Sequence, residues 1–86
     1  MELMLVSGNG CTSCVSMLDI ASNLAKKHNL DFIHHELEDD DKIVEKYGIN
    51  KVPSVLLTDG DKLIAMVGGF QPYEILDMWI DYKINE

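Results

Sequence analysis

The stretch that decides the fold is LMLVSGNGCTSC, which covers residues 3–14. It opens with the continuously apolar run Leu3 to Val6, which is typical of a central strand covered on both faces. Ser7-Gly8-Asn9-Gly10 then favours a tight loop, and helical spacing runs from about Thr12 to His28. We therefore expect Cys11 and Cys14 where a strand gives way to the start of a helix.

The rest of the chain alternates between strand and helix patterns. The elements expected after the first helix are a polar, edge-type strand from Asp31 to Leu37, a short helix from Lys42 to Tyr47, an apolar strand from Ser54 to Thr58, a return strand from Lys62 to Val67 and a last helix that begins at Pro72. Asp39-Asp40-Asp41 and Gly48 suit the two ends of the short helix, and Asp59-Gly60 suits a hairpin turn.

This order of elements predicts the sheet. A strand-helix-strand unit crosses over right-handedly into parallel pairing, so the first two strands are expected to be parallel. The final hairpin must be antiparallel. The sequence therefore predicts an α/β fold of order β-α-β-α-β-β-α, with one mixed four-stranded sheet and helices on both faces.

Helical spacing also predicts which side chains are buried. In the first helix one face is expected to carry Cys14, Val15, Leu18, Ala21 and Ala25, and in the last helix the core face is expected to carry Leu76, Trp79, Ile80 and Ile84. The methionines expected to fill the core are Met4, Met17, Met66 and Met78.

Composition narrows the class of protein. A chain of 86 residues, 47% of them hydrophobic, fits one domain that covers residues 1–86. The seven basic residues are all Lys, and the formal net charge is -8. Binding to nucleic acid or to an anionic membrane surface is therefore not expected, because both rest on cationic side chains. The N-terminus has no basic region and no long apolar run, so we expect a cytoplasmic protein. We also expect a monomer.

The two cysteines of the chain, Cys11 and Cys14, form one CxxC motif. A helix N-terminus presents unpaired N–H groups and a partial positive charge, which favour a thiolate at Cys11. Cys14 lies nearly one turn further on, so its sulfur can come within disulfide distance of Cys11. The spacing predicts an attacking thiol at Cys11 and a sheltered resolving thiol at Cys14, with a redox-active disulfide between them and no bound cofactor.

Three motifs together resemble the thioredoxin/glutaredoxin superfamily, and their order covers essentially the whole chain. They are Cys11-Thr12-Ser13-Cys14 after the first strand, Val52-Pro53 before the third, and Gly68-Gly69 ahead of the last helix. The chain has the length of a glutaredoxin, and Gly69-Phe70-Gln71-Pro72 is similar to small redoxins that reduce ribonucleotide reductase. The carboxyl group that assists the resolving thiol in thioredoxins has no counterpart in Leu3 to Val6.

The resemblance implies roles for further residues. It implies a cis Val52–Pro53 bond beside the disulfide, and a substrate-binding surface that includes Thr12, Ser13, Val52, Pro53, Gly68, Gly69 and Phe70. It also implies disulfide-containing protein substrates, with ribonucleotide reductase as one client, and either thioredoxin reductase or glutathione as electron donor. A net charge of -8 repels anionic glutathione, which favours thioredoxin reductase.

Two other classes of protein remain open at this point. A CxxC motif can be half of a zinc site, or it can hold an iron–sulfur cluster across a dimer. The available histidines are His28, His34 and His35, and the last two point to opposite faces of a strand. The chain could instead be a redox-independent protein-binding subunit, in which case the cysteines would be dispensable.

Overall fold

The computed structural model describes residues 1–37 and 41–86. Its elements follow the predicted order β-α-β-α-β-β-α: β1 (Glu2–Ser7), α1 (Thr12–Lys27), β2 (Asp31–Glu36), α2 (Asp41–Tyr47), β3 (Ser54–Asp59), β4 (Lys62–Gly68) and α3 (Tyr73–Ile84). The last helix begins one residue later than expected, with Pro72 as its N-cap. Asp39 and Asp40, which we expected to open α2, lie outside the described residues.

The four strands form one mixed sheet in the order β2-β1-β3-β4. β1 runs parallel to β2, with Leu5 opposite His34 and Ser7 opposite Glu36. β1 is antiparallel to β3, and β3 is antiparallel to β4. The apolar strands β1 and β3 therefore occupy the centre, and the polar strand β2 lies at the edge as predicted.

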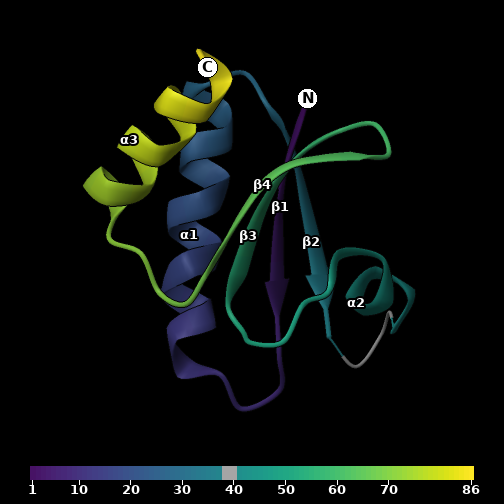
Figure 1. Ribbon diagram of the computed structural model, residues 1–86. Coiled ribbons are helices and arrows are strands. Elements are labelled where there is room, and N and C mark those ends of the chain that lie inside the picture. The colour runs from purple at the N-terminus through teal and green to yellow at the C-terminus, as the bar shows by residue number, and fades with distance from the viewer. Residues whose placement is uncertain (38–40) are drawn as a thin grey trace.

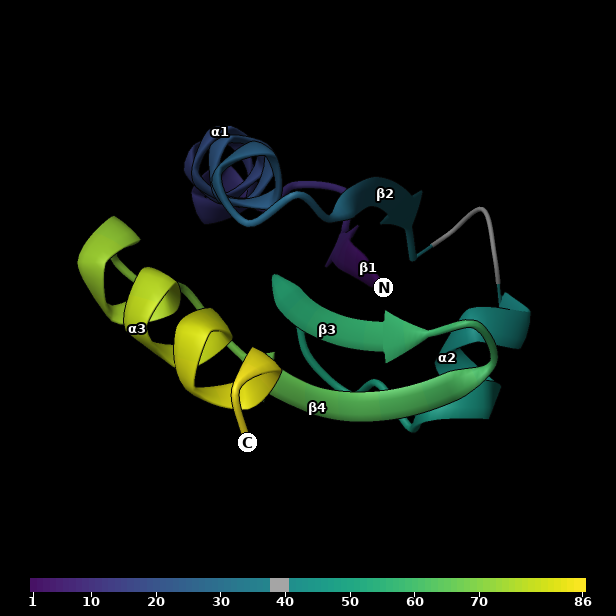
Figure 2. The same ribbon diagram turned by 90° about the horizontal axis from the view of Figure 1, so that it is seen from above.

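The helices divide between the two faces of the sheet, as Figures 1 and 2 show: α1 and α3 lie side by side on one face, and α2 lies on the other. No helix within residues 1–37 and 41–86 is long and apolar enough to cross a bilayer.

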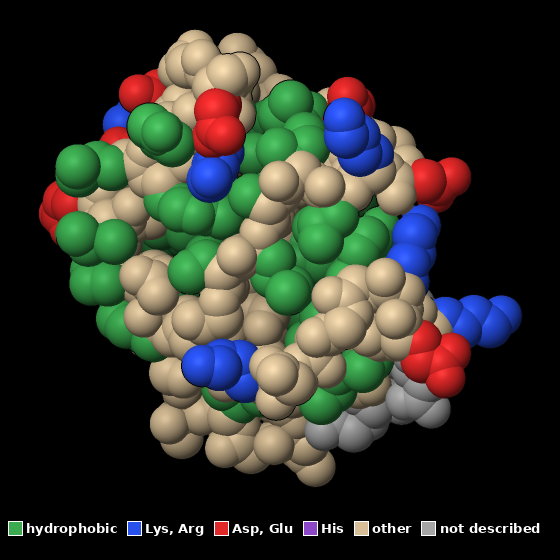
Figure 3. Space-filling view, viewed as in Figure 1, with side chains coloured by type: hydrophobic (Ala, Val, Ile, Leu, Met, Phe, Trp, Pro, Cys, Tyr) green, Lys and Arg blue, Asp and Glu red, His purple; other side chains and the backbone are tan. Residues whose placement is uncertain are grey.

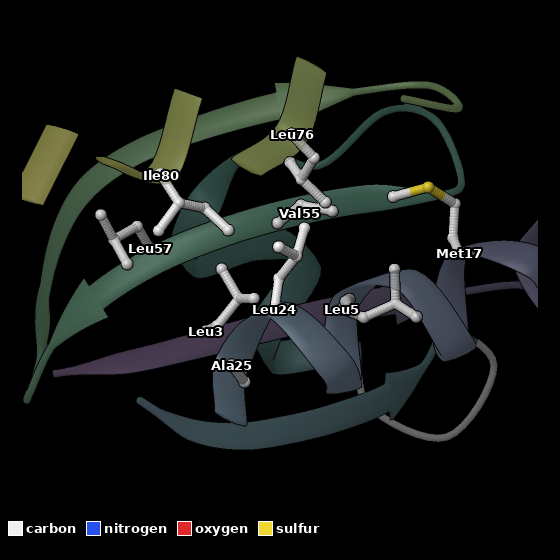
Figure 4. Close-up of a cluster of buried hydrophobic side chains, with 10 residues drawn as sticks. Leu3, Leu5, Met17, Leu24, Ala25, Val55, Leu57, Leu76 and Ile80 are labelled. Atoms are coloured by element: carbon white, nitrogen blue, oxygen red, sulfur yellow. The ribbon is translucent and has the colours of Figure 1, made fainter. Parts of the chain in front are cut away.

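The larger core lies between the sheet and the α1/α3 pair (Figure 4). Alternation along the central strands sends Leu3, Leu5, Val55 and Leu57 to this face, and the helices contribute Met17, Ala21, Leu24, Ala25, Leu76 and Ile80. Asp77, within α3, accepts hydrogen bonds from Lys27 and His28 at the end of α1.

The smaller core lies between the sheet and α2. Its buried members are Met4, Val6, Ile49 and Leu56, with Val44, Tyr47 and Val52 packed against them. Gly48 ends α2 with a φ of 64°, the left-handed conformation that glycine adopts without strain, and the Ile49 N–H donates to the Val44 carbonyl oxygen. The predicted glycine cap is thus present, and Ile49 after it is buried in the smaller core.

Four predicted core residues are wrong. Val15 is 73% exposed and Leu18 is also exposed, because α1 turns Met17 and Leu24 toward the sheet instead. Met66 and Met78 are exposed as well. The remaining expected residues of α3 divide: Leu76 and Ile80 are buried, whereas Trp79 and Ile84 are partly buried and pack at the margin of the core.

Candidate functional site

The two cysteines lie at the junction of β1 and α1. Cys11 is the N-cap of α1, with extended backbone, and Cys14 occupies the first helical turn. Their sulfur atoms are joined in a disulfide, and their Cα atoms are 5.3 Å apart. The strand-to-helix junction that the sequence predicts is therefore the place where the two sulfurs meet.

The two cysteines differ in exposure. Cys11 is half-buried, whereas Cys14 is only 5% exposed beneath the first turn of α1. Between them Thr12 is exposed, and the Ser13 hydroxyl lies 3.6 Å from the Cys11 sulfur. An attacking group from another molecule can thus reach Cys11 more easily than Cys14.

The helix start also favours a negative charge at Cys11. The first turn of α1 contains no acidic residue, and Cys11 makes no side-chain cap hydrogen bond. The positive end of the α1 macrodipole therefore acts on the Cys11 sulfur without a neighbouring carboxylate in that turn. Once the disulfide is reduced, this position stabilises a thiolate.

The Val52–Pro53 segment lies beside the loop that leads to Cys11. Its peptide bond is cis, which is the geometry that the resemblance implies. Pro53 is buried and Val52 is partly buried. A Cβ atom added at Gly8 would lie 3.0 Å from a methyl carbon of Val52, so glycine at this position lets the two loops approach closely.

Gly68 and Gly69, at the end of β4, contact the segment around the Val52–Pro53 bond. The Gly69 N–H donates to the Pro53 carbonyl oxygen at 2.7 Å, and the stem of Lys51 passes close over Gly68. Phe70, the next residue, is 47% exposed. The structure thus brings Pro53, Gly68 and Gly69 together as one rim, with Phe70 at its exposed end.

A pocket of about 140 Å³ opens on the other side of the cysteines. Its walls come from the first turns of α1 and from the carboxyl ends of β1 and β2, and they consist of Ser7, Gly8, Cys11, Cys14, Val15, Leu18, His34 and Glu36. The exposed apolar residues Val15 and Leu18, misassigned to the core by helical spacing, line this pocket.

Sequence reasoning missed three polar residues of this pocket: Ser7, His34 and Glu36. The Ser7 hydroxyl lies 2.6 Å from His34 Nε2 and 3.2 Å from Glu36 Oε1. Strand alternation places His34 and Glu36 on one face of β2. The register that brings this face to Ser7 and Cys14 comes only from the pairing of β1 with β2.

The sequence model of the thioredoxin domain family matches residues 1–80. The chain belongs to this thioredoxin family. Within residues 1–37 and 41–86, no cluster of three or more His, Cys, Asp or Glu side chains is arranged to hold a metal ion.

Solved thioredoxins share the fold. Thioredoxin 1 from the thermophilic eubacterium Thermosipho africanus is 16% identical, with a TM-score of 0.84 over 99% of this chain and 96% of that chain. A mutant thioredoxin from Halobacterium salinarum is 18% identical, with a TM-score of 0.84 over 94% of this chain and 72% of that chain. Thioredoxin-2 of the malaria parasite is 15% identical, with a TM-score of 0.79 over 93% of this chain and 80% of that chain.

No curated protein matches the chain. At these identities the solved structures establish the thioredoxin fold alone. The family match together with a disulfide at the CxxC motif supports a thiol–disulfide oxidoreductase, with disulfide-containing substrates and a reductase partner in general terms.

Proposed function

We propose that the chain reduces disulfide bonds in other proteins by cycling Cys11 and Cys14 between dithiol and disulfide. One observation carries the proposal: a half-exposed cysteine at a helix N-terminus is bonded to a second cysteine that is only 5% exposed. This arrangement supplies one sulfur that can meet a substrate and one that is held for the second step.

The reaction has two exchange steps. The Cys11 thiolate attacks a substrate disulfide, forms a mixed disulfide and releases one substrate thiolate, which takes up a proton. The Cys14 thiolate then attacks the Cys11 sulfur, forms the Cys11–Cys14 disulfide and releases the second substrate thiolate. Two electrons pass from the dithiol to the substrate, and a reductase must return them.

The rim beside the disulfide is the proposed place for the substrate backbone. Val52 and Pro53 lie next to the Gly8 loop, and Gly69 is hydrogen-bonded to Pro53. An extended substrate segment could pair with the main chain at Val52, in the manner of an added strand. Thr12, Ser13, Gly68 and the exposed ring of Phe70 would border it.

We further propose thioredoxin reductase as the electron donor, a cytoplasmic location and ribonucleotide reductase as one client. The net charge of -8 disfavours glutathione, whose carboxylates need cationic partners. Lys51 is exposed and its stem crosses Gly68 at the rim, so it is the cation nearest to the proposed substrate path among the described residues of that rim. The client rests on the resemblance of Gly69-Phe70-Gln71-Pro72 to small redoxins.

Insulin-disulfide reduction tests the activity, with NADPH and either thioredoxin reductase or glutathione plus its reductase. We expect turnover with the first system. Turnover with the glutathione system but not with thioredoxin reductase would overturn the proposed donor and leave the proposed activity standing. If even the chemically reduced protein failed to reduce insulin, the proposed function would be overturned.

The assignment of the two thiols is tested separately. We expect Cys14→Ser to trap a stable mixed disulfide with the substrate and Cys11→Ser to trap none. Alkylation of the reduced protein at mildly acidic pH should label Cys11 ahead of Cys14. Preferential labelling of Cys14 would reverse the two roles.

A redox-independent subunit is the second candidate. Thioredoxin-2 of the malaria parasite, which has this fold, is described as a component of protein secretion machinery. The exposed apolar residues Ile75, Met78 and Tyr82 lie along α3, on the side of the molecule where Figure 3 shows apolar side chains gathered. Replacement of both Cys11 and Cys14 by Ser would preserve the biological role of such a subunit and abolish that of a reductant.

A further inference from the structure

The second exchange step requires a proton acceptor for Cys14. A thiol must become a thiolate before it can attack, and Cys14 is 5% exposed, so bulk water reaches it poorly. The pocket that Cys14 lines offers few groups for this task. Apart from the two cysteines, the titratable side chains of its walls are His34 and Glu36, both from β2, while α1 contributes Val15 and Leu18 and β1 contributes Ser7.

Of His34 and Glu36, His34 has the hydrogen bonds that better suit a proton acceptor. Its Nε2 atom lies 2.6 Å from the Ser7 hydroxyl, which also reaches Glu36 Oε1 at 3.2 Å. Ser7 has a single proton to give. When Ser7 donates it to the Glu36 carboxylate, His34 Nε2–H donates to Ser7, which leaves Nδ1 of the neutral ring free to accept a proton.

The same network can hold the charge that results. Histidine side chains exchange protons near neutral pH, which suits a group that must accept and return one in each cycle. Glu36 Oε1 lies 3.6 Å from His34 Nε2, so a carboxylate oxygen lies beside the ring when it carries the extra proton. Ser7, which is 4% exposed, fixes the distance between the two.

We propose, on the basis of the proposed function, that His34 accepts the Cys14 proton when the mixed disulfide is resolved, and that Ser7 and Glu36 position its ring. The Cys14 S–H bond breaks and its proton passes to the imidazole, through water where the pocket of about 140 Å³ admits it. The Cys14 thiolate forms the bond to Cys11, the bond from Cys11 to the substrate sulfur breaks, and the departing thiolate takes a proton from the imidazolium or from solvent.

Dithiobis-nitrobenzoate, a symmetrical aromatic disulfide with a coloured thiolate, separates the two steps. The reduced protein releases one thiolate when Cys11 attacks the reagent and a second when Cys14 resolves the mixed disulfide. In stopped-flow measurements near neutral pH, we expect His34→Gln to slow the second release by about a hundredfold, which is the low end of what a general base contributes. The first release should keep its rate, and the second should approach the wild-type rate as pH rises.

The matched control is His35→Gln. His35 is the next residue on β2 and lies opposite Val6, which belongs to the core on the other face of the sheet. This variant should leave both releases at the wild-type rate. Glu36→Gln, a change in a positioning residue, should slow the second release by less than His34→Gln does.

The outcomes distinguish this proposal from the function on which it rests. Absence of the first release in the wild-type protein would overturn the function itself. Two normal releases in the wild type and an unchanged second release in His34→Gln would overturn only the role of His34. Equal slowing of both releases in His34→Gln would assign the residue a structural role and overturn the proposal as well.

Discussion

The two faces of the sheet use the same central strands in different ways. Within residues 1–37 and 41–86, ten buried residues form the core on the α1/α3 face, and Cys14 of α1 is also buried. On the α2 face, four buried residues of the same ranges are surrounded by partly exposed ones, among them Val52 of the cis bond. One face thus supports the cysteine pair from beneath, and the other carries the loop proposed to meet the substrate. The α1/α3 face is therefore expected to contribute more to stability, and the α2 face more to substrate contact.

Neighbouring leucines of β3 give the largest expected contrast. Leu57 faces the larger core and Leu56 faces the smaller one, and both side chains are fully buried. We expect Leu57→Ala to lower the free energy of unfolding by about 4 kcal/mol and Leu56→Ala by about 3 kcal/mol, because the looser surroundings of Leu56 can collapse further into the cavity. Urea denaturation measures both.

Each of the two variants serves as a control for the other, because both changes remove the same atoms and their positions are adjacent. Equal losses would show that the two cores are equally close-packed. A larger loss from Leu56→Ala would reverse the comparison. In either case the urea dependence of unfolding should stay that of wild type, which checks that both variants reach the native fold.

A smaller effect is expected at the end of α2. Gly48 has a φ of 64°, and no atom lies within 4 Å of the position that a Cβ would take, so Gly48→Ala introduces backbone strain without a clash. We expect a loss of about 1 kcal/mol in the free energy of unfolding. Insulin reduction should be retained. A loss of activity at unchanged stability would mean that the end of α2, and not only the Val52 loop of the same face, takes part in substrate contact.

The smallest effect is expected from the ion pair that ties α1 to α3. Two hydrogen bonds hold the pKa of Asp77 below its usual range: the one from Lys27 has the larger effect, and the one from His28 the smaller. The pair therefore contributes stability above the unfolded pKa of about 4, and this contribution is lost as pH falls through the lower folded value. Asp77→Asn should flatten the acid side of a plot of melting temperature against pH.

The ion pair on the α2 face should act on the alkaline side, where the Lys27–Asp77 pair also contributes because Asp77 raises the pKa of Lys27. The Asp61 carboxylate, which accepts a hydrogen bond from Lys46 at 3.1 Å, raises the pKa of Lys46. Stability from this pair is present below the unfolded pKa of Lys46 and is lost as pH rises through the raised folded value. Asp61→Asn should thus change only the alkaline side. If Asp61→Asn changed the melting temperature at acid pH as much as Asp77→Asn does, the two ion pairs would not differ in their pH dependence.

Sequence reasoning recovered most of the fold because the strands and turns carry strong local signals. The apolar run of β1 and the glycine after α2 both predicted what the structure contains. The buried face of α1 was harder, because apolar residues occur on two of its faces. Met17 and Leu24 pack into the core, whereas Val15 and Leu18 line a pocket beside the cysteines. Helical periodicity cannot separate a core residue from an apolar residue kept at a site.

The candidate site likewise contains residues that the sequence predicts and residues that it does not. Cys11 and Cys14 could be recognised from the sequence, because a CxxC motif at a strand-to-helix junction has a direct chemical meaning. The Ser7–His34–Glu36 network could not, because its members are separated by 27 and 29 positions along the chain. Their meeting depends on the register of two parallel strands, which no local pattern specifies.

The strand that comes first in the sequence lies second in the sheet, between β2 and β3. Leu3 can therefore find its neighbour Phe32 early, but its other neighbour, Leu57, belongs to a strand made much later. A growing chain can assemble β1, α1 and β2 as a unit while the other edge of β1 still offers unpaired N–H and C=O groups. That edge could pair with a second nascent chain until β3 arrives. During synthesis, the interval before β3 emerges is thus a period in which we expect the open edge of β1 to favour aggregation.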